Sequence, residues 1–172
     1  MERILQEFEV YKLTRELCLE KKEEILKLLN LIPNSHYKIE DIIADKKGER
    51  YLYGKWEYSL LLLKEQEVVG VIIGYERAKE NEGIYSENCF YINEVAISQK
   101  YRGKNLGKEL LKYFLHKIRN YKFLNGKLRV RIQTEKSEKN SKVINLYKSI
   151  GFKEIGIKEY PLKRDIVMEI EK

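Results

Sequence analysis

The chain has 172 residues, of which 43% are hydrophobic and 35% are charged, and its formal net charge is +7 at pH 7. This composition excludes a disordered chain, and the longest apolar run, Leu60–Leu63, is far too short to span a bilayer. We therefore expect one cytoplasmic domain over residues 1–172 with no membrane partner. The basic charge favours an anionic partner but does not identify it.

Alternating and helical apolar spacings divide the first half of the chain into a strand, two helices and a hairpin. Threonine often caps the start of a helix, so Thr14 can begin one. Proline disrupts a helix, so this helix should stop before Pro33. Residues 77–87 show no periodic pattern and are expected to form a loop. The expected elements are a strand ending near Leu13, a helix from Thr14 to the residues before Pro33, a short helix over 37–44, and strands over 58–63 and 68–75.

In the second half, strands alternate with helices. The apolar spacing from Leu106 to Ile118 is helical, and Gly151 is a typical terminator of the later helix, whose stripe holds Val143, Tyr147 and Ile150. The expected elements are strands over 90–97, 128–133, 155–160 and 166–170 and helices over 106–118 and 143–150. The order β-α-α-β-β-β-α-β-α-β-β predicts an α/β sandwich with helices on both faces of one sheet.

The sharpest chemical signal is the segment from Tyr101 to Gly107, which lies between an expected strand and an expected helix. Glycines let the backbone approach a ligand, and the first N–H groups of the helix have no intrahelical partner. Arg102, Lys104 and Lys108 add positive charge, so the segment suits a pyrophosphate. It matches neither the P-loop nor the dinucleotide pattern. A strand-to-helix turn with a solvated basic rim would account for the same residues.

This segment resembles the acetyl-CoA loop of the GNAT N-acetyltransferase superfamily, Arg/Gln-x-x-Gly-x-Gly/Ala, with Arg102 and Gly107 at its two ends. Asn105 stands where the family has a middle glycine, and Asn tolerates the left-handed backbone better than most residues. A second family motif, Asn-x-x-Ala-x-x-Leu-Tyr followed by Gly-Phe, is similar to the run formed by Asn140, Val143, Leu146, Tyr147, Gly151 and Phe152. The resemblance extends from about residue 88 to the end.

The resemblance implies a GNAT-type α/β (α+β) fold, with a mixed, mostly antiparallel sheet of six to seven strands. It also implies an N-acetyltransferase that moves an acetyl group from acetyl-CoA to a primary amine by direct attack, without a metal. The acceptor, a small amine or an amine of a peptide or protein, is not identified. The cofactor-binding residues it implies are Val95, Ala96, Ile97, Arg102, Gly103, Lys104, Asn105, Leu106, Gly107, Lys108, Asn140 and Tyr147.

Two residues are the candidates for proton transfer. A phenol stays protonated at neutral pH and can protonate a leaving thiolate, so Tyr147 is the expected general acid, although its helical stripe also suits a core tyrosine. Glu94, on the strand before the loop, is the expected base, although it could instead point to solvent. Tyr91 and Glu135 are further candidates. A dedicated base is also dispensable if a low-dielectric pocket lowers the pKa of the amine.

Other classes of function are less well supported by the sequence. Cys18 and Cys89 are read as buried thiols, and His36 and His116 do not suggest a nucleophilic triad. A non-catalytic module that binds CoA or a nucleotide would not need Tyr147. A nucleic-acid-binding module would suit the charge, but the 13 tyrosines are spread over strand and helix patterns. A homodimer is compatible with the family, but no sequence feature demands one.

Overall fold

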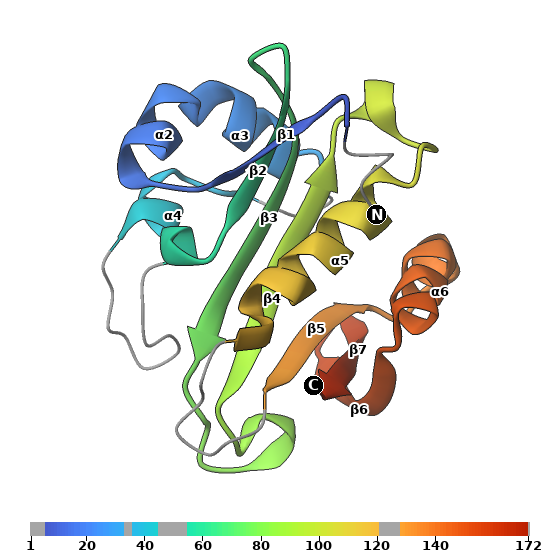
Figure 1. Cartoon of the computed structure of the whole chain (residues 1–172). Coiled ribbons are helices and arrows are strands. Elements are labelled where there is room, and N and C mark those ends of the chain that lie inside the picture. The colour runs from blue at the N-terminus through green and yellow to red at the C-terminus, as the bar shows by residue number, and fades with distance from the viewer. Residues whose placement is uncertain (1–5, 33–35, 45–54, 121–127, 172) are drawn as a thin grey trace.

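The computed structural model describes residues 6–32, 36–44, 55–120 and 128–171. Within these residues the strands form a seven-stranded sheet in the order β1-β2-β3-β4-β5-β7-β6 (Figure 1). Neighbouring strands are antiparallel except β4 and β5, which are parallel. The strands are β1 (Glu9–Lys12), β2 (Leu60–Lys64), β3 (Glu67–Arg77), β4 (Cys89–Ile97), β5 (Arg129–Glu135), β6 (Lys153–Tyr160) and β7 (Lys163–Glu171). The mixed, mostly antiparallel sheet confirms the expected fold class.

Helices cover both faces of this sheet. They are α2 (Arg15–Glu20), α3 (Lys22–Leu29), α4 (Glu40–Ile43), α5 (Leu106–Lys117) and α6 (Ser141–Ile150). Side chains alternate along a strand, so the run Leu60–Leu63 is shared between two cores. Leu61 and Leu63 pack with the residues of α2, α3 and α4, while Leu60 and Leu62 pack in the core that contains α5. No helix in the described part of the chain is both long and apolar enough to cross a membrane.

The expected single helix after Thr14 is instead two helices. Thr14 caps α2 as predicted, because its hydroxyl accepts a hydrogen bond from the N–H of Leu17 at 3.1 Å. The chain leaves helical geometry at Lys21 (φ −98°, ψ 18°), the residue that precedes α3 as its N-cap. The Lys21 ammonium donates to the carbonyl oxygen of Gln66 at 3.0 Å. This contact with the β2–β3 turn is tertiary, so no local signal in the sequence announces the break.

The short helix expected over residues 37–44 begins only at Glu40. The carboxylate of Asp41 accepts a hydrogen bond from the N–H of Lys38 at 3.0 Å, and the side-chain oxygen of Asn30 accepts one from the N–H of Tyr37 at 3.1 Å. These side chains take up the backbone N–H groups that precede the helix. Tyr37 therefore lies outside α4, in an irregular segment.

The sheet divides between β4 and β5. In the described residues the two strands pair only over Phe90–Ile92 and Val130–Ile132. Beyond Ile92, β4 continues to pair with β3 as far as Ile97, and β5 continues to pair with β7 as far as Glu135. Figure 1 shows the two strands diverging after the short stretch in which they pair. The divergence leaves one edge of residues 93–97 without a neighbouring strand.

A β-bulge in β4 lies at the start of this divergence. Ile73 pairs with Glu94 and Gly74 pairs with Ile92, so Asn93 is the extra residue. A bulge reverses the alternation of side chains that follow it. Phe90 and Ile92 pack in the α5 core before the bulge, and Val95 and Ile97 pack against that core after it. Glu94 is thereby directed to the opposite face, where α2 to α4 lie.

Candidate active site

The loop between β4 and α5 is built around two left-handed residues. Gly103 has φ +80° and Asn105 has φ +59°, so the asparagine adopts the backbone conformation that the middle glycine of the family would adopt without strain. The Nε–H of Arg102 donates to the carbonyl oxygen of Ile97 at 3.1 Å and fixes the loop to the end of β4. Arg102 and Lys104 are exposed, and Lys108 is half-buried. The loop therefore presents three cations around the start of α5.

The backbone at the start of α5 is accessible. An added Cβ would meet no atom within 4 Å at Gly103, and at Gly107 it would meet only Cγ1 of Ile97, at 3.5 Å. Asn105 is the N-cap residue but makes no side-chain capping hydrogen bond among the described residues. Leu106, by contrast, is buried in the core. A helix start with open N–H groups and nearby cations can bind the phosphates of a nucleotide cofactor.

Val95, Ala96 and Ile97 form the strand segment that precedes this loop. Val95 and Ile97 are half-buried on the α5 side, and Ala96 is buried on the other face. One edge of the segment pairs with β3, and the other faces the opening between β4 and β5. Backbone groups on that second edge need partners that β5 does not provide. These are the groups expected to face the acyl-carrying end of a cofactor.

Tyr147 lies on α6 and is almost fully buried. Gly151 ends the helix with φ +112°, and the N–H of Phe152 then donates to the carbonyl oxygen of Tyr147 at 3.1 Å. The rings of Tyr147 and Phe152 lie 6.0 Å apart between centroids. Burial raises the pKa of the Tyr147 phenol, and the charge of Glu94 raises it further. Tyr147 is therefore both a core tyrosine and a phenol within electrostatic reach of Glu94, whereas Val143, expected on the same stripe, is exposed.

Glu94 is the end of a hydrogen-bonded cluster. Its Oε1 accepts hydrogen bonds from the Tyr37 hydroxyl at 2.9 Å and from Nδ2 of Asn93 at 3.3 Å. The Lys55 ammonium donates to Oδ1 of Asn93 at 3.3 Å. Burial raises the pKa of Glu94, while these two hydrogen bonds and the charges of Lys55 and Lys163 oppose the rise. Of the alternatives that the sequence left open for Glu94, the structure shows a half-buried, hydrogen-bonded side chain at the cavity.

The cluster borders a cavity of about 930 Å³. Its walls come from both halves of the chain: the segment before α4, η1 (Lys55–Glu57), β4, the end of β5 with the loop that follows, and the β6–β7 hairpin. Tyr91 and Glu135, the alternative bases, also line it. Burial raises the pKa of Tyr91 well above its ordinary value, which disfavours the phenolate that a base would require. Glu135 is exposed.

Asn140 lies at the cavity wall rather than acting as a side-chain cap. It occupies the N-cap position of α6, its side chain makes no capping hydrogen bond within the described part of the chain, and its Nδ2 donates to the carbonyl oxygen of Glu135 at 3.1 Å. This bond ties the start of α6 to the end of β5. Asn140 thus lies beside the opening between β4 and β5. Its contact with a cofactor stays a prediction.

A polar network forms the hairpin wall of the cavity. Nε2 of Gln133 donates to the Tyr160 hydroxyl at 2.8 Å and to Oδ2 of Asp165 at 2.6 Å, and Oε1 accepts from the Tyr85 hydroxyl at 2.9 Å. Lys163 donates to the same Asp165 oxygen at 3.1 Å. These contacts hold the hairpin at the cavity, and they join residues that are separated widely in sequence.

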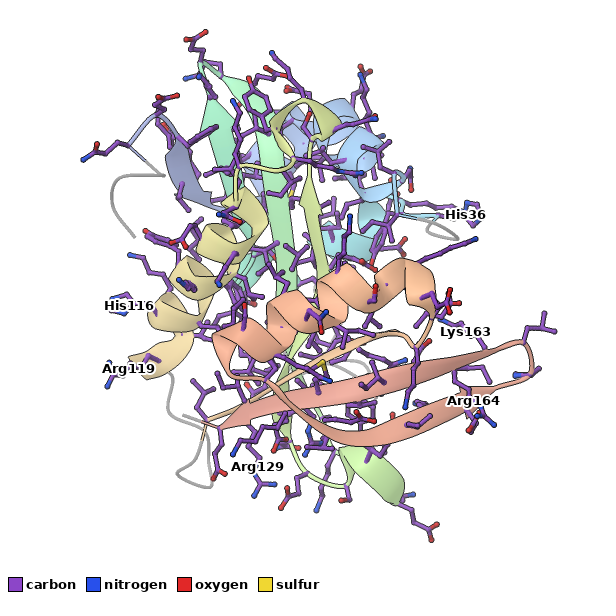
Figure 2. All side chains as sticks on the ribbon, turned by 90° about the vertical axis from the view of Figure 1, so that its right-hand side faces the viewer. His36, His116, Arg119, Arg129, Lys163 and Arg164 are labelled. Atoms are coloured by element: carbon purple, nitrogen blue, oxygen red, sulfur yellow. The ribbon has the colours of Figure 1, made fainter. Side chains whose placement is uncertain are left out.

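The histidines and cysteines do not build a nucleophilic centre. His36 and Lys163 lie on one side of the molecule, and His116 lies on the other (Figure 2). His36 lines the cavity, while His116 is exposed on α5. Cys18 and Cys89 are both buried, as expected, and burial raises each thiol pKa to about 12. A thiol with so high a pKa supplies little thiolate, so Cys89 is a poor acyl carrier.

Several cavity residues were not predicted from the sequence. Tyr37 and Lys55 come from segments whose patterns suggest only a helix and a polar stretch, and Tyr160, Lys163 and Asp165 come from a strand pair. The acidic and amide residue types of the Asn93-Glu94 pair were a usable signal. No periodicity or motif marks Tyr37 and Lys55 as members of the site.

Comparison with known proteins agrees with this architecture. The model of the acetyltransferase (GNAT) family matches residues 23–152. No curated protein is similar enough in sequence to match. Solved structures are similar in fold at low identity: the NatC complex bound to Gag peptide and CoA has a TM-score of 0.71 at 17% identity, covering 96% of this chain and 99% of that chain.

Two further structures show the same likeness. Ard1 from Thermoplasma volcanium has a TM-score of 0.71 at 17% identity, covering 96% of this chain and 97% of that chain. Arabidopsis thaliana Naa50, in complex with the bisubstrate analogue CoA-Ac-MVNAL, has a TM-score of 0.68 at 16% identity, covering 95% and 98%. The family model covers most of the chain. The chain therefore belongs to the acetyltransferase (GNAT) family and is an N-acetyltransferase.

Proposed function

We propose that the protein binds acetyl-CoA across the opening between β4 and β5 and transfers the acetyl group to a primary amine held in the cavity. The observation that carries the proposal is the placement of Tyr147 and Glu94. The first belongs to the half of the molecule that contains β5 and the second to the half that contains β4, and yet the charge of Glu94 acts on the Tyr147 phenol. In this proposal both groups serve one reaction centre, Glu94 from the cavity wall and Tyr147 from the buried face of α6.

The residues fit the proposed cofactor. Gly103 and Gly107 leave the loop backbone open, and Arg102, Lys104 and Lys108 surround it with positive charge, so the diphosphate would bind at the start of α5. Acetyl-CoA supplies the activated acyl group as a thioester. The unpaired edge of β4 would place a backbone N–H against the thioester oxygen, and one such donor is worth about 3 kcal/mol in the transition state.

Two side chains would then move the protons. Glu94 accepts a proton from the ammonium form of the acceptor, which leaves a neutral amine able to form the new C–N bond. Tyr147 donates its hydroxyl proton to the sulfur as the C–S bond breaks, so CoA leaves as a thiol. A base works best when its pKa is near the working pH, and burial moves the pKa of Glu94 in that direction. After the C–N bond forms, the nitrogen loses its second proton, which restores the Tyr147 hydroxyl, and Glu94 releases its own proton to solvent. The products are then one acetylated amine, one thiol and one proton.

Calorimetric titration with acetyl-CoA, with ATP as the control ligand, tests the first part of this proposal. Binding in the micromolar range that is selective for acetyl-CoA supports it, and selective binding of ATP or RNA would contradict it. Acceptors are then compared by the release of CoA thiol, with small primary amines in one arm and short peptides with free N-termini in the other. The acceptor class follows from the arm that gives the higher kcat/KM.

A further inference from the structure

Tyr37, Asn93 and Glu94 form a chain of hydrogen bonds with a single direction. The Lys55 ammonium donates to Oδ1 of Asn93, Nδ2 of Asn93 donates to the Tyr37 hydroxyl, and the Tyr37 hydroxyl donates to Oε1 of Glu94 at 2.9 Å. The chain begins at a cation and ends at a carboxylate. Hydrogen bonds that follow one another in this way polarise and strengthen each other.

The direction of the chain is fixed by the chemistry of its members. Ammonium has only donors, and the amide of Asn93 has one acceptor side and one donor side. A tyrosine hydroxyl has one proton, so when it accepts a hydrogen bond from Asn93 its own proton is directed to Glu94. The ionised carboxylate accepts this bond without a conflict. A Glu94 protonated on Oε2 could still accept at Oε1, but a neutral carboxyl accepts weaker hydrogen bonds than a carboxylate does.

We infer that Tyr37 is the positioning residue for Glu94, and that Lys55 acts on the same carboxylate both through Asn93 and by its own charge, so that the N-terminal half of the chain sets the group that accepts the acceptor's proton. This inference rests on the proposed role of Glu94 as the base. The inference gives Tyr37 and Lys55 a role in controlling Glu94, although both lie outside the two sequence motifs, which are in the second half of the chain. Tyr37 touches Glu94 and acts through it rather than on the reacting atoms.

Packing holds the cluster in place. The N–H of Tyr37 donates to the side-chain oxygen of Asn30 at 3.1 Å, which fixes the backbone of this irregular segment. The Lys55 ammonium lies 5.9 Å from the centroid of the Tyr37 ring and 5.3 Å from that of Tyr75. Aromatic faces stabilise a cation that has lost water. Lys55 therefore stays close to Asn93, although burial lowers the pKa of its ammonium.

Other charged and titratable groups also act on this cluster. Burial is the main influence that raises the pKa of Glu94, and the Tyr37 bond is the first of those that lower it. The charge of Asp41 raises the pKa of Tyr37 and that of Lys55. The groups around Glu94 are Tyr37 and Asp41 beside α4, Lys55 in η1, Tyr75 on β3, Tyr91 on β4, Tyr147 on α6 and Lys163 on β7.

The test is the pH dependence of kcat/KM with a good amine acceptor. In Tyr37→Phe the ring stays and the donor is lost, so the midpoint of the acid limb should rise by about one pH unit. Lys55→Met should raise it in the same direction, and Lys55→Arg should restore it. Because the two act through one chain, the shift in the double variant should be smaller than the sum of the single shifts.

Two controls separate this effect from a general change in the cavity. Tyr160→Phe removes a cavity hydroxyl that bonds with Gln133 rather than with Glu94, so it should leave the midpoint in place. An imidazole titrates near neutral pH, so His36→Gln checks that the limb does not belong to His36. A ¹³C NMR titration of the Glu94 carboxyl in wild type and in Tyr37→Phe measures the same shift without turnover, including for variants with low activity.

The outcomes are distinct. A raised midpoint and a raised carboxyl pKa in Tyr37→Phe support the inference. If Glu94→Gln abolishes the acid limb of the kcat/KM profile but Tyr37→Phe leaves its midpoint unchanged, the inference is overturned and Glu94 remains the proposed base. If the acid limb of kcat/KM survives in Glu94→Gln, another group is the base. This result overturns both the role of Glu94 as the base and the role of Tyr37 as its positioning residue. Absence of acetyl-CoA binding in the wild type is a separate failure, that of the proposed cofactor.

Discussion

Burial raises the pKa of the Tyr147 phenol, and the carboxylate of Glu94, on a different element, raises it further. The negative charge of Glu94 thus helps keep the phenol protonated until a proton is needed. If Glu94 takes the proton of the acceptor amine, its charge disappears and one obstacle to ionising Tyr147 disappears with it. In the proposed reaction, proton uptake by the base therefore favours proton release by the acid.

Replacing Tyr147 with phenylalanine should separate catalysis from binding. The ring that packs on Phe152 is kept and only the hydroxyl is lost, so the fold and the affinity for acetyl-CoA should change little. Loss of a general acid should lower kcat by about 100-fold. The measurement is CoA thiol release at saturating acceptor, with calorimetry for the cofactor. An unchanged kcat would remove Tyr147 from the acid role.

Side chains of increasing size at Gly107 should probe the phosphate site. A Cβ at this position would make an ordinary contact with Ile97, at 3.5 Å, so Gly107→Ala should fold and bind the cofactor. Gly107→Val adds bulk where the backbone is expected to approach the diphosphate, and it should weaken acetyl-CoA binding by at least about tenfold. Calorimetry on the two variants gives the comparison. Equal affinities in Gly107→Val and wild type would mean that the loop is only a turn.

Titration of Glu94 should make stability depend on pH. Its folded-state pKa is raised above the ordinary value, chiefly by burial. Folding therefore favours the protonated form, and the stability that this contributes at low pH is lost as the pH rises through the raised pKa. Between about pH 5 and about pH 8 the free energy of unfolding of the wild type should fall relative to that of Glu94→Gln, as measured by chemical denaturation.

The matched control for this prediction is Glu135→Gln, which neutralises an exposed carboxylate of the same cavity. Its free energy of unfolding should stay within about 0.5 kcal/mol of the wild type at both pH values. A difference between wild type and Glu94→Gln that does not change with pH would show that Glu94 does not titrate in this range.

A methyl group at Gly74 should destabilise the fold. The added Cβ would lie 2.6 Å from Cζ of Phe114 and 3.0 Å from Cε1 of Phe90, so two packed rings would have to move. Gly74→Ala should lower the free energy of unfolding by about 1–3 kcal/mol, as urea denaturation can show. Adding Phe114→Leu should recover part of this loss by making room. If the double variant is as unstable as the sum of the two single variants, the clash with Phe114 is not the cause.

The second half of the fold could be predicted because its signals are local. The apolar spacing of α5, the left-handed Asn105 and the terminating Gly151 depend on neighbours in the sequence, and all three are found. The loop and the pair Gly151-Phe152 are likewise placed as the motifs suggested. Propensity and capping are decided within a few residues, so one sequence suffices for them.

The acceptor side of the site could not be predicted, for a physical reason. Alternation along β4 assigns Glu94 to the face of Phe90 and Ile92, and only the bulge at Asn93 moves it to the face of Tyr37. The bulge lies in the pairing of β4 with β3, and Lys21, at the break between α2 and α3, contacts Gln66. The contact at Lys21 leaves no trace in periodicity, whereas the spacing of Phe90, Ile92, Val95 and Ile97 does change phase at the bulge. Glu94 was found as a candidate, but its partners were not.

The division between β4 and β5 has a consequence for the mechanics of the molecule. Among the residues that the structure describes, three pairs join the two parts of the sheet, and the backbone beyond them on β4 has one row of polar groups facing an opening. A ligand bound in the opening would bridge β4 and β5 where these strands do not pair with each other. Ligand binding should then stiffen the whole sheet, so the amides of residues 93–97 should exchange with solvent more slowly once the site is filled.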